Sequence, residues 1–205
     1  MPTREFSLEP DGPKRVKIEW KGMWKNIRVS FDDQPLGVIE NQKALKAGAD
    51  FGMPDGKTLH VELATGLQAN LQVLLDGKPL PGSGNDPATQ LKTAVGIVYF
   101  IAGLNVVVGV AAMAGVGFLL EMGLGWPTVV EGTIIGGLGY WVQERRSKAA
   151  LIVVMALVAA SGILSVMVAT EAGHQPPIGG TVVRVLFLLF MFTGLKAIDK
   201  LEAKG

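Results

Sequence analysis

The stretch 94–120, AVGIVYFIAGLNVVVGVAAMAGVGFLL, contains 27 residues and no charged side chain. A helix needs about 20 apolar residues to cross the hydrocarbon core of a bilayer, so this stretch predicts a membrane span. It separates two parts of different composition. Residues 1–90 carry 11 Lys/Arg and 12 Asp/Glu, whereas residues 91–205 carry only 8 and 6. The first part therefore has the composition of a soluble domain and the second that of a membrane domain.

Further apolar stretches toward the C-terminus bring the predicted number of membrane helices to four. The second of them is short and Gly-rich and contains Glu131. It ends at Tyr140 and Trp141, and such aromatic side chains are enriched at membrane interfaces. The four predicted spans are 93–116, 126–143, 149–170 and 181–198.

The basic residues predict how these spans are oriented. Those near the span ends lie in the second-to-third loop and in the C-terminal tail, whereas the loops before Trp126 and Thr181 contain no Lys or Arg. The positive-inside rule then predicts a multi-pass protein of the bacterial inner membrane, with both termini and the β domain in the cytoplasm. The polar segment 1–11, which lacks the layout of a signal peptide, agrees with this prediction. The basic residues concerned are Arg145, Arg146, Lys148, Lys196, Lys200 and Lys204.

Residues 1–85 are predicted to form a soluble β domain. Apolar and polar residues alternate through most of 14–32 and again in 59–63 and 71–75, as in strands with one buried face. Pro54-Asp55-Gly56 and Asp76-Gly77 supply the turn residues that hairpins need. The apolar faces must cover one another, which favours a small β-sandwich or an open barrel. The predicted fold class is an α+β membrane protein, with a β-sandwich before a bundle of four transmembrane helices in 86–205, and 12–82 is expected to fold alone.

Two tryptophans stand out in the β domain. Trp20 continues the inward alternation and is predicted to lie in the core. Trp24 follows Gly22 at a bend and is predicted to be an exposed docking contact. His60 falls on the polar face and is predicted to be solvated, because no second histidine or acidic cluster stands at the spacing of metal ligands. The stretch 79–87 is rich in Pro and Gly and predicts a linker.

Polar residues at membrane depth are the best candidates for function, because a charge in hydrocarbon needs a partner. Asn105, Glu131 and Arg184 qualify. Glu131 and Arg184 lie at matching depths in one leaflet and are predicted to pair, either as an ion pair that fixes helix register or as part of a gate or proton relay. Gly132 and Gly136 form a GxxxG pair, which indicates close helix packing within the chain or in a dimer.

Several classes of function find no support in the sequence. The chain has no cysteine, which excludes disulfides and thiolate metal sites. Both histidines lie outside the predicted spans, so no axial ligand for haem is available in the membrane. Motifs of hydrolases and nucleotide-binding proteins are missing, and no basic stripe suits nucleic acid. We expect no catalytic residue, cofactor or metal, and no enzyme activity.

The segments LQVLLDGKPLPGS at 71–83 and VGIVYFIAGLN at 95–105, with Asp86-Pro87 between them, resemble uncharacterised bacterial membrane proteins. Those proteins join an N-terminal cytoplasmic β domain to a multi-span helical tail. The resemblance implies the same two-part architecture here. It implies no activity, because the shared motifs are structural.

The sequence leaves three hypotheses for function. The leading one is a non-catalytic accessory or assembly subunit of a larger bacterial membrane complex, with respiratory and photosynthetic complexes as candidate hosts. Its β domain would be a docking module, and its partners would be the lipid bilayer and other membrane subunits. The alternatives are a small-solute or ion channel or transporter, and a membrane-anchored sensor whose β domain binds a ligand.

Overall fold

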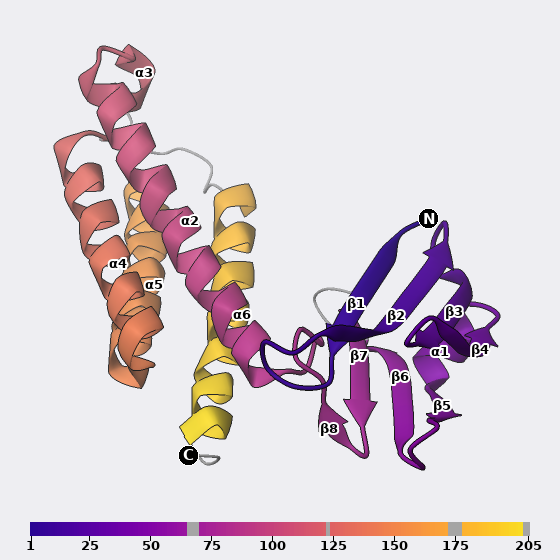
Figure 1. Cartoon of the computed structure of the whole chain (residues 1–205). Helices are drawn as coiled ribbons and strands as arrows, with labels where there is room; N and C mark the ends of the chain where they lie inside the picture. The colour runs from indigo at the N-terminus through magenta and orange to yellow at the C-terminus, as the bar shows by residue number, and fades with distance from the viewer. Residues whose placement is uncertain (65–69, 122–123, 172–177, 203–205) are drawn as a thin grey trace. The chain divides into compact units, whose positions relative to one another are not determined.

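The computed structural model describes the chain except for residues 65–69, 122–123, 172–177 and 203–205. Its internal contacts divide it into two compact units, Met1–Thr89 and Gln90–Gly205. The first unit contains the strands and the second consists of helices (Figure 1). The predicted α+β class, with a β region before a helical part, is confirmed.

Two antiparallel four-stranded sheets make up most of the first unit. Each sheet keeps its strands in sequence order, so neighbours are joined by short connections. A short helix, α1 (Gln42–Ala47), lies between the two sheets in the sequence. The first sheet contains β1 (Thr3–Ser7), β2 (Lys14–Lys21), β3 (Lys25–Phe31) and β4 (Gln34–Ile39). The second contains β5 (Ala49–Gly52), β6 (Thr58–Ala64), β7 (Asn70–Leu75) and β8 (Lys78–Pro79).

Both sheets contribute side chains to one hydrophobic core. The alternation predicted these faces correctly: Ile18 of β2 and Val61 of β6 are fully buried, whereas their neighbours in sequence are partly exposed. β1 also supplies Phe6, which is only 2% exposed. The strands form because a period-two pattern can bury one face of a sheet while the other face remains in water.

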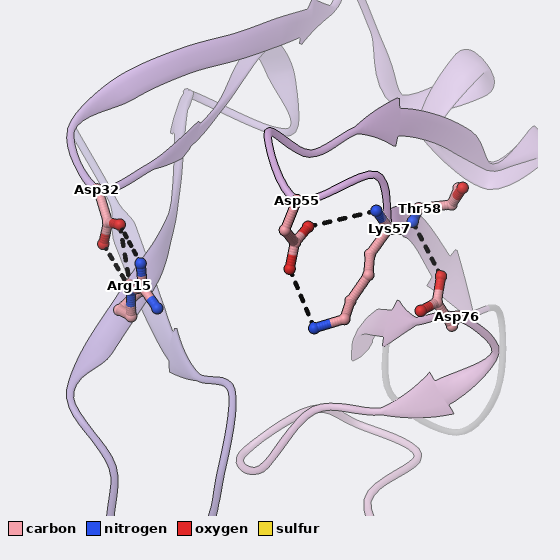
Figure 2. Close-up of polar contacts among 6 residues, drawn as sticks. All are labelled: Arg15, Asp32, Asp55, Lys57, Thr58 and Asp76. Carbon is pink, nitrogen blue, oxygen red and sulfur yellow. Dashed lines mark hydrogen bonds and ion pairs between the residues drawn. The ribbon is translucent and has the colours of Figure 1, made fainter.

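The turns follow the residue types that their backbone angles require. Asp76 and Gly77 both have positive φ values, 47° and 76°, and Leu75 pairs with Lys78 across them. Asp and Gly tolerate this geometry, which suits a tight two-residue hairpin. The carboxylate of Asp76 also accepts a hydrogen bond from the backbone N–H of Thr58 at 2.9 Å (Figure 2). The turn is therefore attached to β6.

The predicted linker 79–87 is hydrogen-bonded to the second sheet. The hydroxyl of Ser83, a buried residue, accepts a hydrogen bond from the N–H of Val73 at 3.0 Å. The N–H of Gly84 donates to the carbonyl of Leu71, also at 3.0 Å. The breaker residues prevent a helix here, as expected, but their backbone groups bond to β7 instead of to water.

In the described residues, the second part of the chain forms five helices. Three contain segments that are long and apolar enough to cross a membrane, Pro87–Met113, Lys148–Val168 and Thr181–Glu202. A helix also forms where the second span was predicted, but this helix, α4, is not among the three. Its four glycines and Glu131 lower its hydropathy, so the predicted count of four spans is not confirmed. The helices are α2 (Pro87–Met113), α3 (Gly117–Glu121), α4 (Trp126–Arg145), α5 (Lys148–Glu171) and α6 (Ile178–Glu202).

Asp86 caps the N-terminus of α2. Its carboxylate accepts hydrogen bonds from the backbone N–H of Thr89 at 3.2 Å and from the Thr89 hydroxyl at 2.7 Å. Pro87 is the first helical residue, where its missing N–H costs nothing.

Glycines set the distance between α2 and α4. Gly132 and Gly139 of α4 both face α2, seven residues apart. A Cβ added to Gly132 would lie 2.7 Å from the carbonyl oxygen of Ala102, and one added to Gly139 would lie 2.8 Å from Val98. The later glycine, Gly139, faces the earlier residue of α2, Val98, and Gly132 faces Ala102. The two helices are therefore antiparallel. Their backbones approach closely only because these positions lack a side chain.

The start of α5 lies beside the end of α6. The Lys148 ammonium contacts the carboxylates of Asp199 and Glu202, each at 2.6 Å. Gly194 of α6 in turn packs on Ala94, near the start of α2. The basic ends of α4, α5 and α6 and the start of α2 therefore lie at one end of the helical unit (Figure 1).

Candidate functional site

The hairpin between β2 and β3 carries the two tryptophans singled out by the sequence. The rings of Trp20 and Trp24 stack with centroids 4.4 Å apart and an angle of 18° between their planes. Both are partly exposed and pack on the edge of the hydrophobic core. Trp20, predicted as a core residue, is thus a partly buried member of a pair, and the docking role of Trp24 stays a prediction.

The backbone of this hairpin is unusual. Gly22, Trp24 and Asn26 have positive φ values of 50°, 57° and 46°. Gly and Asn tolerate this region, but for a residue as bulky as Trp it costs about 1–2 kcal/mol. An aromatic pair contributes about 0.5–1.5 kcal/mol beyond its burial. The stack on Trp20 therefore offsets most of the cost of placing a tryptophan at this position.

The residues around the stack add two further features that do not serve stability. Met23, at the tip, is 80% exposed. Lys21 and Lys25 are paired directly across the ladder, an arrangement that destabilises a sheet. Neither lysine forms an ion pair within the described part of the chain. Unfavourable local features that occur together, here a strained tryptophan, an exposed methionine and a pair of like charges, are typical of functional sites. We call residues 20–25 the tryptophan tip.

His60 has acidic neighbours that the sequence did not reveal. Its Nδ1 lies 2.7 Å from a carboxylate oxygen of Asp50, and its Nε2 lies 3.7 Å from Glu62. Asp50 reaches it because β5 pairs with β6 in a register that places the two residues opposite each other. The ring also lies against Gly48, where a Cβ would come within 2.6 Å. The contact with Asp50 could not be predicted, because β5 was not predicted.

These three groups do not form a metal site. No group of three or more His, Cys, Asp or Glu in the part of the chain that the structure describes could hold a metal ion. The contacts of His60 are instead the cross-strand and same-strand pairs of a sheet surface, with the imidazole 33% exposed. Their chemistry is that of a polar cluster at the sheet surface.

A second polar cluster joins β2 to the turn after β3 (Figure 2). The guanidinium of Arg15 donates to both carboxylate oxygens of Asp32, with Nε 2.9 Å from Oδ1, and stacks over the ring of Phe31 at 4.5 Å. The hydrogen bond from Arg15 lowers the pKa of the Asp32 carboxyl, and the carboxylate raises the pKa of Arg15. The pair is exposed, so water screens its contribution to stability.

We expect Asp32→Asn to lower the urea midpoint of the β unit slightly at neutral pH and not at about pH 2. Because the pKa of Asp32 is lower in the folded state than in the unfolded state, its ionised form stabilises the fold at pH values above the unfolded-state pKa of about 3.9. This stabilisation is lost as the pH falls through the folded-state pKa. Tryptophan fluorescence of the stacked pair would follow the transition. Asp33→Asn is the matched control, because Asp33 has a similar φ of 61° and forms no ion pair among the described residues. A midpoint difference that persists in acid would contradict the assignment.

Asn105 of α2 lies at the contact between α2 and α4. A Cβ added to Gly132 of α4 would lie 2.9 Å from the Cβ of Asn105 in α2. Glu131, the residue before Gly132, is therefore near the level of Asn105, eight residues from the end of α2 at Met113. On its own helix, Glu131 lies five residues after Trp126, the first residue of α4, or about 7.5 Å along the helix.

Glu131 and Arg184 are not brought into contact. The side chain of Arg184 in α6 packs against α5, with its Cδ 3.2 Å from a Cβ added to Gly162. Glu131 lies on α4, and α4 and α6 flank α2 and α5 on opposite sides (Figure 1). Neither charge forms an ion pair with any side chain that the structure describes. Counting residues predicts how far each charge lies along its helix but not the face of the helix on which it lies.

The two glycines of the predicted GxxxG pair, Gly132 and Gly136, differ in how closely they approach α2. Gly132 touches the backbone of α2, whereas a Cβ at Gly136 would make an ordinary contact of 3.6 Å with Ala102. The close contacts follow a spacing of seven residues, from Gly132 to Gly139, and not the GxxxG spacing of four. That heptad spacing was available in the sequence and would have identified the packed face.

No family model matches the chain, and no curated protein or solved structure matches it. The resemblance of segments 71–83 and 95–105 to two-part bacterial membrane proteins therefore stays a prediction.

Proposed function

We propose that the protein is a non-catalytic accessory or assembly subunit of a larger bacterial membrane complex. The observation that carries this proposal is the separation of Glu131 and Arg184. A charge within a bilayer costs about 2.5–3.5 kcal/mol by insertion scales and is normally paired. Because neither has an ionic partner among the described side chains, we infer that a neighbouring subunit supplies the opposite charges.

A channel or transporter is less well supported. Such proteins place several polar residues near the bilayer midplane, around a solute path. Here Asn105 lies beside Gly132 in a close helix contact. Glu131 and Arg184 lie on helices that flank the bundle on opposite sides. This arrangement favours contacts with other chains over a path through this one.

We propose further that α4 is the fourth span. It lies along α2, itself long and apolar enough to cross a membrane, from Gly139 to Gly132, so a bilayer around α2 would surround α4 as well. Its exposed aromatic residues support this: Trp126 is 63% exposed at one end and Tyr140 62% exposed at the other. They are separated by about 21 Å along the helix, as expected for anchors at two interfaces.

The proposed topology places both termini and the β unit in the cytoplasm, because the basic ends of the helices share one side. Reporter fusions at positions 90, 146 and 205 should then give the same compartment, and a fusion at position 174 the opposite one. If the fusions at 146 and 90 differ, α4 does not cross the bilayer.

The β unit serves in this proposal as the docking module, with Trp24 as its contact residue. A β-sandwich, in which the two sheets cover each other, is supported by the core that both sheets share. A hydrogen bond of 3.4 Å from Arg4 of β1 to Asn70 of β7 also joins the sheets. A rigid unit of this kind can hold the tryptophan tip in a fixed shape for binding.

The test is gentle detergent solubilisation of the tagged chain from its native membrane, followed by sizing and identification of copurifying subunits. We expect a stable heteromeric complex. Glu131→Gln and Arg184→Gln should each weaken it, with additive effects because the two charges do not touch. Glu144→Gln is the matched control, since Glu144 lies on α4 beyond the predicted span and is exposed.

Other outcomes would support the competing hypotheses. A homo-oligomer without other subunits, unaffected by the two substitutions, would contradict the proposal and favour a channel. A small ligand that raises the melting temperature of the β unit in the intact chain would favour a sensor.

A further inference from the structure

We propose that the tryptophan tip binds the anionic headgroup region of the lipid bilayer. This inference rests on the proposed role of the β unit as a cytoplasmic docking module and names the partner of its contact residue. The partner is a surface rich in acidic phospholipids. The tip has exposed apolar side chains, it has two lysines without an ionic partner among the described residues, and its unit is joined directly to α2.

The apolar part of the tip consists of three side chains at one hairpin. Met23 is 80% exposed, and Trp20 and Trp24 on either side of it in the sequence stack on each other. Tryptophan prefers the interface between hydrocarbon and headgroups, where its ring is partly apolar and its N–H can bond to water.

The charge of the tip suits an acidic surface. Lys21 and Lys25 face each other across the hairpin and have no ionic partner among the described residues. The nearest acidic side chain on β2, Glu19, is already paired with Lys17 at 3.0 Å. Two lysines held side by side repel each other in water, and a layer of phosphate groups relieves that repulsion.

The attachment of the β unit favours a bilayer over a protein partner. The side chain of Asn85 still donates a hydrogen bond to Gln72 of β7 at 3.3 Å, and Pro87 already begins α2. Two residues span at most about 7 Å, so the β unit stays at high effective concentration near any bilayer that α2 crosses.

Membrane binding would explain why a tryptophan occupies the strained backbone position 24. A glycine would fit φ of 57° without cost, so stability alone does not explain the tryptophan. Its ring supplies interfacial affinity that a glycine lacks. Trp24→Gly should therefore preserve the hairpin while removing the membrane contact, which separates folding from binding.

The test uses the full chain, which contains no cysteine. Met23→Cys is labelled with an environment-sensitive fluorophore, and the protein is reconstituted in nanodiscs of phosphatidylcholine with or without about 30% phosphatidylglycerol. We expect a blue shift and protection from aqueous iodide only in the anionic discs, reversed by about 0.5 M salt. The same label on Lys43→Cys, an exposed position on α1, is the control and should not respond.

The variants give the expected magnitudes. In the labelled background, Lys21→Gln and Lys25→Gln should each lower the ratio of docked to undocked tip roughly fivefold. Trp24→Gly should abolish the blue shift, and thermal unfolding of the β unit would show separately what the lost stacking on Trp20 costs. If that variant fails to fold, the two lysine substitutions and the salt dependence still show whether the tip binds anionic lipid.

An identical Met23 signal in neutral and anionic discs would overturn the inference. So would a protected Met23 that depends on a copurified subunit and not on lipid, which would identify a protein as the partner. Neither result would affect the proposal of a subunit, since that proposal depends on Glu131 and Arg184. Conversely, if no other subunit copurifies with the chain, the nanodisc experiment still tests whether the tip binds lipid.

Discussion

Replacing Gly132 with alanine is expected to destabilise the helical unit by about 1–3 kcal/mol, the usual cost of overpacking. The added Cβ would lie 2.7 Å from the carbonyl oxygen of Ala102 and 2.9 Å from the Cβ of Asn105. The first of these is a backbone atom and cannot rotate away. α2 and α4 would have to separate, and the close contacts along Gly132 and Gly139 would be lost together.

Gly137→Ala is the matched control on the same helix. A Cβ at Gly137 would meet nothing within 4 Å, so this variant should gain up to about 1 kcal/mol from the higher helix propensity of alanine. Thermal unfolding in detergent, measured on both variants, would show opposite signs. Equal shifts would mean that α2 and α4 do not pack through Gly132.

A fragment of residues 1–86 is expected to fold alone, whereas 12–82, the range expected from the sequence, is expected to be largely unfolded. A domain of this size has about 4–13 kcal/mol of stability. The shorter fragment loses β1 and with it Phe6, and removing a buried phenylalanine costs about 3–5 kcal/mol. It also loses Ser83 and Gly84, which bond to Val73 and Leu71.

Circular dichroism and urea unfolding would compare the two fragments. Phe6→Ala within 1–86 should account for about 3–5 kcal/mol of the difference. Val38→Ala is the control: it also removes an apolar side chain, but from a residue that is 59% exposed, so its effect should stay within about 0.5 kcal/mol. A cooperative transition for 12–82 equal to that of 1–86 would show that β1 adds nothing.

Local patterns were sufficient for the elements that have a strong period. β2, β3, β6 and β7 lie where the alternation predicted them, and the Asp76-Gly77 turn has the angles expected from its residues. The apolar runs became long helices. β1 and β5 escaped prediction because they are short and mostly exposed, so neither shows a repeating apolar face.

The sites were harder to predict than the elements. Depth in the membrane follows from counting residues, and on that basis Glu131 and Arg184 could pair. Which way a side chain points around the bundle depends on how four helices pack, and the glycines of α4 turn one face of that helix toward α2. In the same way, Asp50 meets His60 only through the register of β5 and β6.

The sequence by itself determined that this protein has a β part and a helical part with membrane-like segments, because period and hydropathy are local properties that any fold must satisfy. Only the tertiary structure decided the stacking of Trp20 on Trp24, the separation of Glu131 from Arg184 and the attachment of segment 79–87 to β7. These depend on contacts between residues distant in sequence or on exact backbone angles. Such contacts are selected by the packing of the whole unit and leave no periodic signal in the chain.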